Sequence, residues 1–163
     1  SAGVNSGVDF MSLGHLFFKA EYRALDKNFV PGYFNDNYET NPINLASIEV
    51  SSGNKNGYLV QADAAVMDIL SAMAAFESYE KSNPTITARA KVDYDKYYVQ
   101  YGFNQSNFVD FRSFTLDNGA VLTTDIGYKV NPNTMLIWHY KSAYDPTVGQ
   151  VVNSSYYEAK IGF

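Results

Sequence analysis

Apolar and polar residues alternate along most of this chain of 163 residues, and this alternation limits the possible folds more than any other feature. Side chains that alternate with a period of two lie on opposite faces of a β-strand. Turn residues divide the alternation into eleven candidate strands, most of them about 8–12 residues long. The pattern predicts an all-β fold, an antiparallel up-and-down β-barrel segment of about 10–12 strands in one unit over residues 1–163. The candidate strands span 3–12, 15–26, 44–52, 57–67, 71–81, 85–94, 97–104, 108–117, 119–129, 133–143 and 152–163.

The charged residues fall on one face of the best-defined strands. The strand over 85–94, for example, alternates Arg89, Lys91 and Asp93 with small apolar residues such as Ala88 and Ala90. A soluble barrel would turn the apolar face inward and a membrane barrel would turn it outward, and alternation by itself fits both. The strand length, the small residues on the apolar face and the tyrosines near strand ends favour a transmembrane barrel. These tyrosines are Tyr22, Tyr94 and Tyr128.

Composition excludes several classes of protein. The net charge of −5 and the absence of a basic run argue against nucleic-acid binding. The absence of cysteine excludes disulfides and thiolate metal sites. No stretch approaches the roughly 18 consecutive apolar residues that a membrane-spanning helix needs.

The predicted connections form two alternating sets. Five short connections fall in one set, and the two long loops, around 27–43 and 144–152, fall in the other. Tight turns at one end of a meander and longer loops at the other are typical of outer-membrane barrels. The short connections are Leu13-Gly14, the SGNKNG stretch, Ser82-Asn83-Pro84, the NQSN stretch and Val130-Asn131-Pro132.

The stretch 60–81 fits two interpretations. Apolar residues there, including Val66, Ile69 and Met73, recur at helical spacing, and the stretch is followed by Ser82-Asn83-Pro84, a plausible helix stop. A helix would replace two strands and leave the up-down order of the other strands unchanged. The sequence therefore leaves two structures open for residues 60–81, a pair of strands or one helix.

An outward apolar face would leave the charged face lining the interior of the barrel. We assign nine bases and nine acids to that face, so that the interior is charged but balanced. The bases include Lys81, and the acids include Asp9, Glu49, Asp63 and Glu77. The residues expected to line a pore and set its selectivity are Lys19, Glu21, Arg23, Arg89, Lys91, Asp93, Asp110, Arg112, Asp125, Lys129, Lys141, Glu158 and Lys160.

The last ten residues, SSYYEAKIGF, place Tyr157, Ala159, Ile161 and Phe163 on one face. This end resembles the C-terminal strand of bacterial outer-membrane β-barrel proteins, porins among them. The hairpin DIGYKVNPNTMLIWHYKSAYD, with its Asn-Pro turn, is also similar to hairpins of these proteins. The resemblance implies a bacterial outer-membrane location, contact with outer-membrane lipid, and recognition of these four residues by the barrel assembly machinery.

The predicted number of strands gives a further expectation. Single-chain bacterial barrels have an even number of strands, whereas eleven is odd. We therefore expect the chain to be the C-terminal section of a longer protein, with further strands or subunits completing the barrel.

The sequence offers little that is typical of catalysis or cofactor binding. His15 and His139 have no Asp or Ser at a spacing that indicates a triad, and no phosphate-binding or dinucleotide-binding loop occurs. We expect neither an enzyme nor a cofactor. Asp36 and Glu39 could hold calcium, although their spacing is not that of an EF-hand loop. The aromatic loop 27–43 could fold into the pore as a constriction, dock on a partner or pack against the rim.

The primary functional hypothesis is an outer-membrane pore for passive diffusion of small polar or ionic solutes. A first alternative is a non-conducting outer-membrane barrel that serves as an anchor or subunit of an envelope complex. A second alternative is a soluble β-barrel that binds an apolar ligand and turns its apolar faces inward.

Overall fold

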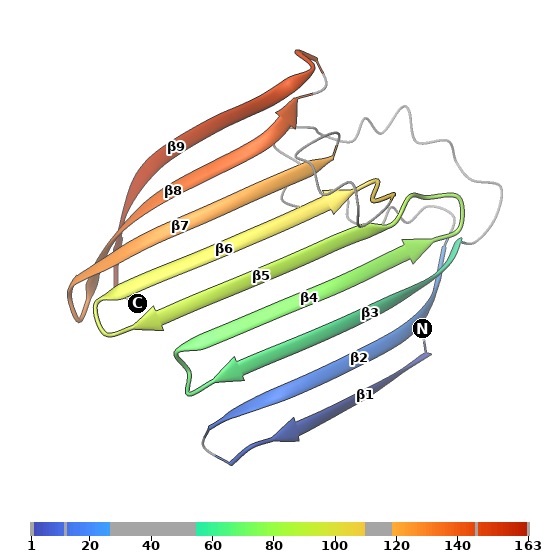
Figure 1. The fold of residues 1–163 in the computed structure, drawn as a ribbon, viewed down its shortest axis with the longest axis horizontal. Coiled ribbons are helices and arrows are strands. Elements are labelled where there is room, and N and C mark those ends of the chain that lie inside the picture. The colour runs from blue at the N-terminus through green and yellow to red at the C-terminus, as the bar shows by residue number, and fades with distance from the viewer. Residues whose placement is uncertain (1, 12, 27–54, 110–118, 146, 163) are drawn as a thin grey trace.

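The computed structural model describes residues 2–11, 13–26, 55–109, 119–145 and 147–162. Nine strands in these ranges form one antiparallel sheet in the order β1 to β9, each strand pairing with the next (Figure 1). The alternating pattern predicted this all-β meander. The strands are β1 (Ala2–Asp9), β2 (Gly14–Leu25), β3 (Lys55–Val66), β4 (Leu70–Tyr79), β5 (Thr85–Tyr94), β6 (Tyr97–Ser106), β7 (Ala120–Asn131), β8 (Thr134–Asp145) and β9 (Gln150–Ile161).

The sheet is open, because β1 and β9 are its two edges and do not pair with each other. Both edge strands run in the same direction, since nine strands alternate in direction between them (Figure 1). The described ranges contain no helix, and therefore none of the length and hydropathy that would cross a membrane.

The two faces of the sheet differ in chemistry. Directly opposed residues of paired strands point to the same face, so the register assigns every side chain to a face. We call the face of Lys19, Gln61, Thr87 and Lys141 the charged face, and the face of Ala20, Val60, Ala88 and Ser142 the apolar face. The charged face follows the odd-numbered residues of every strand except β6 and β9, where it follows the even-numbered ones; in β7 the rule holds up to Lys129, after which the register shifts.

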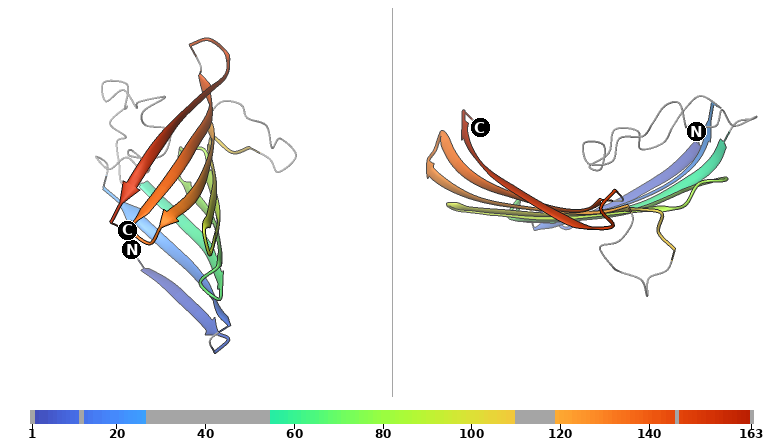
Figure 2. Two further views of the ribbon diagram at one scale, coloured as in Figure 1. Left: turned by 90° about the vertical axis from the view of Figure 1, so that its left-hand side faces the viewer. Right: turned by 90° about the horizontal axis from the view of Figure 1, so that it is seen from above.

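The sheet is curved, with its two edges bent toward the same side (Figure 2). Side chains converge on the concave side of a curved sheet and diverge on the convex side. Adjacent residues show this difference: Leu59 on the charged face is 7% exposed and Val60 on the apolar face is 50% exposed. In β8, Ile137 on the charged face is 6% exposed and Leu136 on the apolar face is 52% exposed. The charged face is therefore the concave one.

The predicted grouping of the connections is wrong. β2 pairs directly with β3, and β6 pairs directly with β7, so the expected strands at 44–52 and 108–117 do not lie between them in the sheet. Each extra strand inverts the direction of those that follow it. The connection at 80–84 consequently lies at the same end as the connections from β2 to β3 and from β8 to β9, and the short connections at 67–69 and 95–96 lie at the opposite end. The expected long loop at 144–152 is also wrong, because β8 extends to Asp145 and β9 begins at Gln150, so that only residues 146–149 connect them. Residues 44–52 and 110–118 are outside the described ranges.

The stretch 60–81 forms strands and not a helix. β3 and β4 pair through the hairpin at 67–69, where Met67 and Asp68 have positive φ values of 51° and 55°. The helical spacing of Val66, Leu70 and Met73 arose because apolar residues occur on both faces: Met73 lies on the charged face, opposite Asp63. Pairing with strands on both sides satisfied the backbone hydrogen bonds that a helix would have made internally.

Candidate functional site

The charged face carries every charged side chain of the nine strands. Sixteen Asp, Glu, Lys and Arg residues lie within the strand bounds, and the register places none of them on the apolar face. The eight bases are Lys19, Arg23, Lys55, Arg89, Lys91, Lys129, Lys141 and Lys160, and the eight acids are Asp9, Glu21, Asp63, Glu77, Asp93, Asp125, Asp145 and Glu158.

Eleven residues that the sequence predicted to line a pore share this concave face: Lys19, Glu21, Arg23, Arg89, Lys91, Asp93, Asp125, Lys129, Lys141, Glu158 and Lys160. The other two, Asp110 and Arg112, lie outside the described residues, as does Glu49. The assignment of Lys81 to the charged face is wrong, because Lys81 lies in the turn after β4, with a positive φ of 60°. Lys55 and Asp145 were missed because the predicted strands 57–67 and 133–143 exclude them, whereas β3 begins at Lys55 and β8 ends at Asp145.

The first charge cluster of this face joins β2 to β4 across β3. The Arg23 guanidinium donates to the Glu21 carboxylate from Nη2 at 2.7 Å and to the Glu77 carboxylate from Nη1 at 2.6 Å. Lys19 contributes a second cation to Glu21, at 3.2 Å, and the Tyr79 hydroxyl donates to Glu77. Because the guanidinium is shared by carboxylates of β2 and β4, it links these two strands across β3.

Two further clusters lie nearer the C-terminal part of the sheet. Lys129 on β7 pairs with Asp93 on β5 across β6. His139 on β8 lies between two carboxylates, with Nδ1 2.8 Å from Asp125 on β7 and Nε2 2.9 Å from Glu158 on β9. Its ring stacks on Tyr156, with the ring centroids 4.5 Å apart. These contacts bridge β7, β8 and the edge strand β9.

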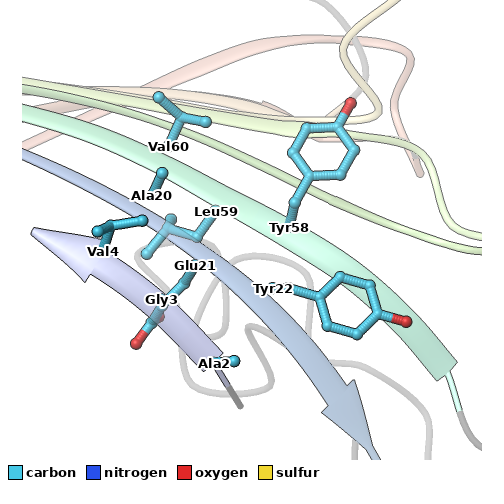
Figure 3. A pocket seen from close by; sticks show the side chains of 9 residues that line it. All are labelled: Ala2, Gly3, Val4, Ala20, Glu21, Tyr22, Tyr58, Leu59 and Val60. Atoms are coloured by element: carbon cyan, nitrogen blue, oxygen red, sulfur yellow. The ribbon is translucent and has the colours of Figure 1, made fainter.

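The apolar face has small residues in its middle and aromatic residues toward both ends. An alanine patch occupies the middle of β3, β4 and β5 and consists of Ala62, Ala64, Ala72, Ala74, Ala88 and Ala90. Toward one end Tyr22 opposes Tyr58, and toward the other Tyr97 lies between Tyr94 and Tyr128. A shallow, mainly apolar hollow of about 510 Å³ lies near the β1 edge. Figure 3 shows Tyr22, Tyr58, Ala20 and Val60 among the side chains that line it.

The apolar face is partly covered where the connection from β6 to β7 begins. Phe108 is 6% exposed, packs edge-on against Phe76 of β4 with a centroid distance of 6.4 Å, and donates its backbone N–H to Pro84 O. Ile86 and Phe103 are buried in the same part of the sheet. The sequence did not predict this contact, because the alternation placed Phe108 at the start of a further strand over 108–117, whereas it follows the end of β6 at Ser106.

The predicted assembly signal lies on the edge strand β9. Tyr157, Ala159 and Ile161 share the apolar face, and Tyr157 and Ile161 are among the most exposed large apolar side chains of the described residues. Phe163 is outside the described ranges. Whether the barrel assembly machinery recognises this end stays a prediction.

The remaining predicted sites involve metals and catalysis. Asp36, Glu39 and the loop 27–43 lie outside the described ranges. In the part of the chain that the structure describes, no group of three or more His, Asp or Glu residues has a geometry that could hold a metal ion. His15 lies at the start of β2 on the charged face, opposite Asp9 and far along the sheet from His139.

Comparisons with protein-family models, with curated proteins and with solved structures give no match to this chain, so the two faces of the sheet are the basis for any functional conclusion.

Proposed function

We propose that this chain forms part of the wall of a transmembrane β-barrel in a bacterial outer membrane, and that the barrel is a pore for passive diffusion of small polar or ionic solutes. The observation that carries the proposal is the absence of charged side chains from the convex face of all nine described strands. A convex face that water surrounds has no reason to exclude charge, whereas lipid makes each charge on that face costly.

The dimensions of the sheet fit this role. Five of the nine strands have twelve residues. At a rise of about 3.3 Å per residue such a strand is about 40 Å long. A tilt of about 40° reduces its height to about 30 Å, enough for the apolar band of roughly 25 Å that outer-membrane barrels present to lipid.

The distribution of aromatic residues supports the same orientation. Tyrosine prefers the boundary between lipid and water, where its ring contacts apolar groups and its hydroxyl contacts water. The Tyr22–Tyr58 pair and the row of Tyr94, Tyr97 and Tyr128 lie toward opposite ends of the strands, with the alanine patch between their levels. A soluble barrel that binds an apolar ligand would instead place these side chains on its concave side.

The open edges require partners for a closed barrel. β1 and β9 run in the same direction, so these nine strands cannot close on one another with an antiparallel pair. We propose that further strands or subunits complete the wall and satisfy the unpaired backbone groups of both edges, as lipid demands. The exposed 12-residue β9 presents such an edge, and its C-terminal end, with Tyr157, Ala159 and Ile161, is the segment that resembles an assembly signal.

The single tryptophan offers a direct test of orientation. Trp138 lies on the apolar face of β8, opposite Tyr157. We expect lipids brominated in the acyl chain to quench its fluorescence in reconstituted vesicles, and aqueous iodide to quench it little. The reverse result would place the apolar face away from lipid and overturn the transmembrane proposal.

Conductance tests the pore itself. We expect folded full-length protein to give discrete ion currents in planar bilayers. If the protein folds, its tryptophan is quenched by lipid and no current appears, the non-conducting anchor or subunit is correct and the pore is not.

A further inference from the structure

The ring of His139 lies between two carboxylates on the charged face, one from each neighbouring strand. Its Nδ1 is 2.8 Å from Asp125 on β7, and its Nε2 is 2.9 Å from Glu158 on β9. The ring also stacks on Tyr156 of β9, with the centroids 4.5 Å apart and an interplanar angle of 20°. Because the stack limits rotation of the ring, both nitrogens stay directed at their carboxylates.

The number of protons on the ring decides how many of these two contacts are hydrogen bonds. The imidazolium has an N–H on both nitrogens and donates to Asp125 and to Glu158 at once, whereas neutral imidazole has one N–H and one lone pair. At these distances a lone pair that faces a carboxylate oxygen repels it. Loss of one proton from His139 therefore removes one of the two contacts and keeps the other.

The exposure of the two carboxylates decides which contact is lost. The Asp125 side chain is 22% exposed and the Glu158 side chain is 47% exposed. A carboxylate with little access to water loses more when its donor is removed, because water cannot replace that donor. The remaining proton of neutral His139 therefore stays on Nδ1, facing Asp125, and the lone pair of Nε2 faces Glu158.

The other charged or titratable groups around the ring do not titrate with histidine. Within the described strands, they are two lysines and two tyrosines. Lysine ordinarily keeps its charge, and tyrosine stays neutral, over the pH range in which histidine changes charge. They are Lys141, two residues along β8, Tyr156 and Lys160 on β9, and Tyr98 on β6 beyond Asp125.

We infer that His139 is a pH-sensitive link between β7 and the edge strand β9. In the imidazolium form it joins Asp125 to Glu158, and in the neutral form it keeps Asp125 and releases Glu158 to water. The charged face loses one positive charge in this step and gains a carboxylate without a donor. For its effect on transport the inference rests on the proposed function: a pore lined by this face becomes more selective for cations as the pH rises.

The first measurement tests the link without any ion current. It is nuclear magnetic resonance of the full chain in detergent micelles, with ¹⁵N in histidine and ¹³C in the glutamate carboxyl groups, between about pH 6 and pH 8.5. We expect His139 to carry two protons at the lower pH and only the Nδ1 proton at the higher, and the Glu158 carboxyl signal to shift with the same midpoint. H139Q should abolish the Glu158 shift, and H15Q, which removes the other histidine of the chain, should leave it.

Three results would overturn the link. They are an unchanged protonation state of His139 over this range, a neutral ring that keeps its proton on Nε2, and a Glu158 shift that survives in H139Q. The titration of the unmodified protein needs no variant, so the link is tested even if H139Q does not fold. Circular dichroism shows whether the variants fold.

The second measurement is the reversal potential of ion current across planar bilayers in a KCl gradient. We expect it to shift toward cation preference when the pH is raised in the unmodified protein and in H15Q. The shift should be smaller in H139Q, and also in H139K, which keeps a positive charge at both pH values. Equal shifts in H15Q and H139Q would refute the role of His139 in selectivity and leave the pore standing. A His139 titration that releases Glu158 in a folded protein without current would keep the link and refute the pore.

Discussion

Replacing Ala74 by lysine would place a charge in the middle of the apolar face. Ala74 lies near the middle of β4, between Ala62 on β3 and Ala88 on β5. Its sequence neighbour Ala75 lies at nearly the same depth on the charged face, between Gln61 and Thr87. A74K and A75K therefore introduce the same side chain into the same strand, and only the face differs.

The expected costs differ by a wide margin. Lysine on the lipid-facing side near the bilayer midplane costs about 2–4 kcal/mol, which lowers the folding equilibrium constant about 30- to 1,000-fold. On the charged face the ammonium stays in a polar, wet environment, and we expect A75K to cost less than about 1 kcal/mol. If the apolar face were exposed to water instead, A74K would cost little.

The assay is reversible unfolding of both variants and the unmodified protein in lipid vesicles, with denaturant as the variable and Trp138 fluorescence as the signal. The difference in free energy between A74K and A75K is the quantity of interest, because effects of lysine on strand propensity cancel in it. Equal costs for the two variants would refute the assignment of the apolar face to lipid. A larger cost for A75K would mean that the charged face is the one that contacts lipid.

Three further predictions concern contacts that hold the strands together. R23Q should lower the free energy of unfolding by about 1 kcal/mol, a modest loss because Arg23 is only partly buried. A double-mutant cycle with E77Q should show coupling between the two residues, and additive effects would mean that their 2.6 Å ion pair contributes nothing. H139A should speed amide hydrogen exchange in β9 relative to β3, because the link from Asp125 through His139 to Glu158 is lost, and uniform or unchanged exchange would contradict that link. G57A should lower the free energy of unfolding by about 1–3 kcal/mol, since a Cβ there would lie 2.2 Å from Tyr79 Cδ1 and 2.4 Å from Ser78 O. The double variant G57A/Y79A should recover little of this stability, because the contact with Ser78 is with the backbone, and full recovery would mean that only the Tyr79 ring clashes.

The positions of most strands could be predicted from the sequence, because period-two alternation is a local property of consecutive residues. The helical alternative at 60–81 could not be excluded that way. Met73 on the charged face and Leu70 on the apolar face gave a helix-like spacing only because apolar residues occur on both faces. The pairing of β4 with both β3 and β5 decided in favour of strands over a helix, and strand pairing depends on residues far apart in the sequence.

The arrangement of the site needed the register of the whole sheet. The sequence placed Arg23 and Glu77 on the same type of face, yet nothing in it showed that β2 and β4 lie two strands apart and that these side chains meet. The same holds for Asp93 with Lys129, and for the two carboxylates beside His139.

By itself, then, the sequence determined that this protein is a meander of long strands with one charged and one apolar face, because neighbouring side chains on a strand must point in opposite directions. Only the tertiary structure decided which connections lie at which end, which charges pair, and that the charged face is the concave one. These properties depend on how many strands separate two segments and on the curvature of the sheet. Curvature arises from the pairing of all nine strands together and is not a property of any one of them.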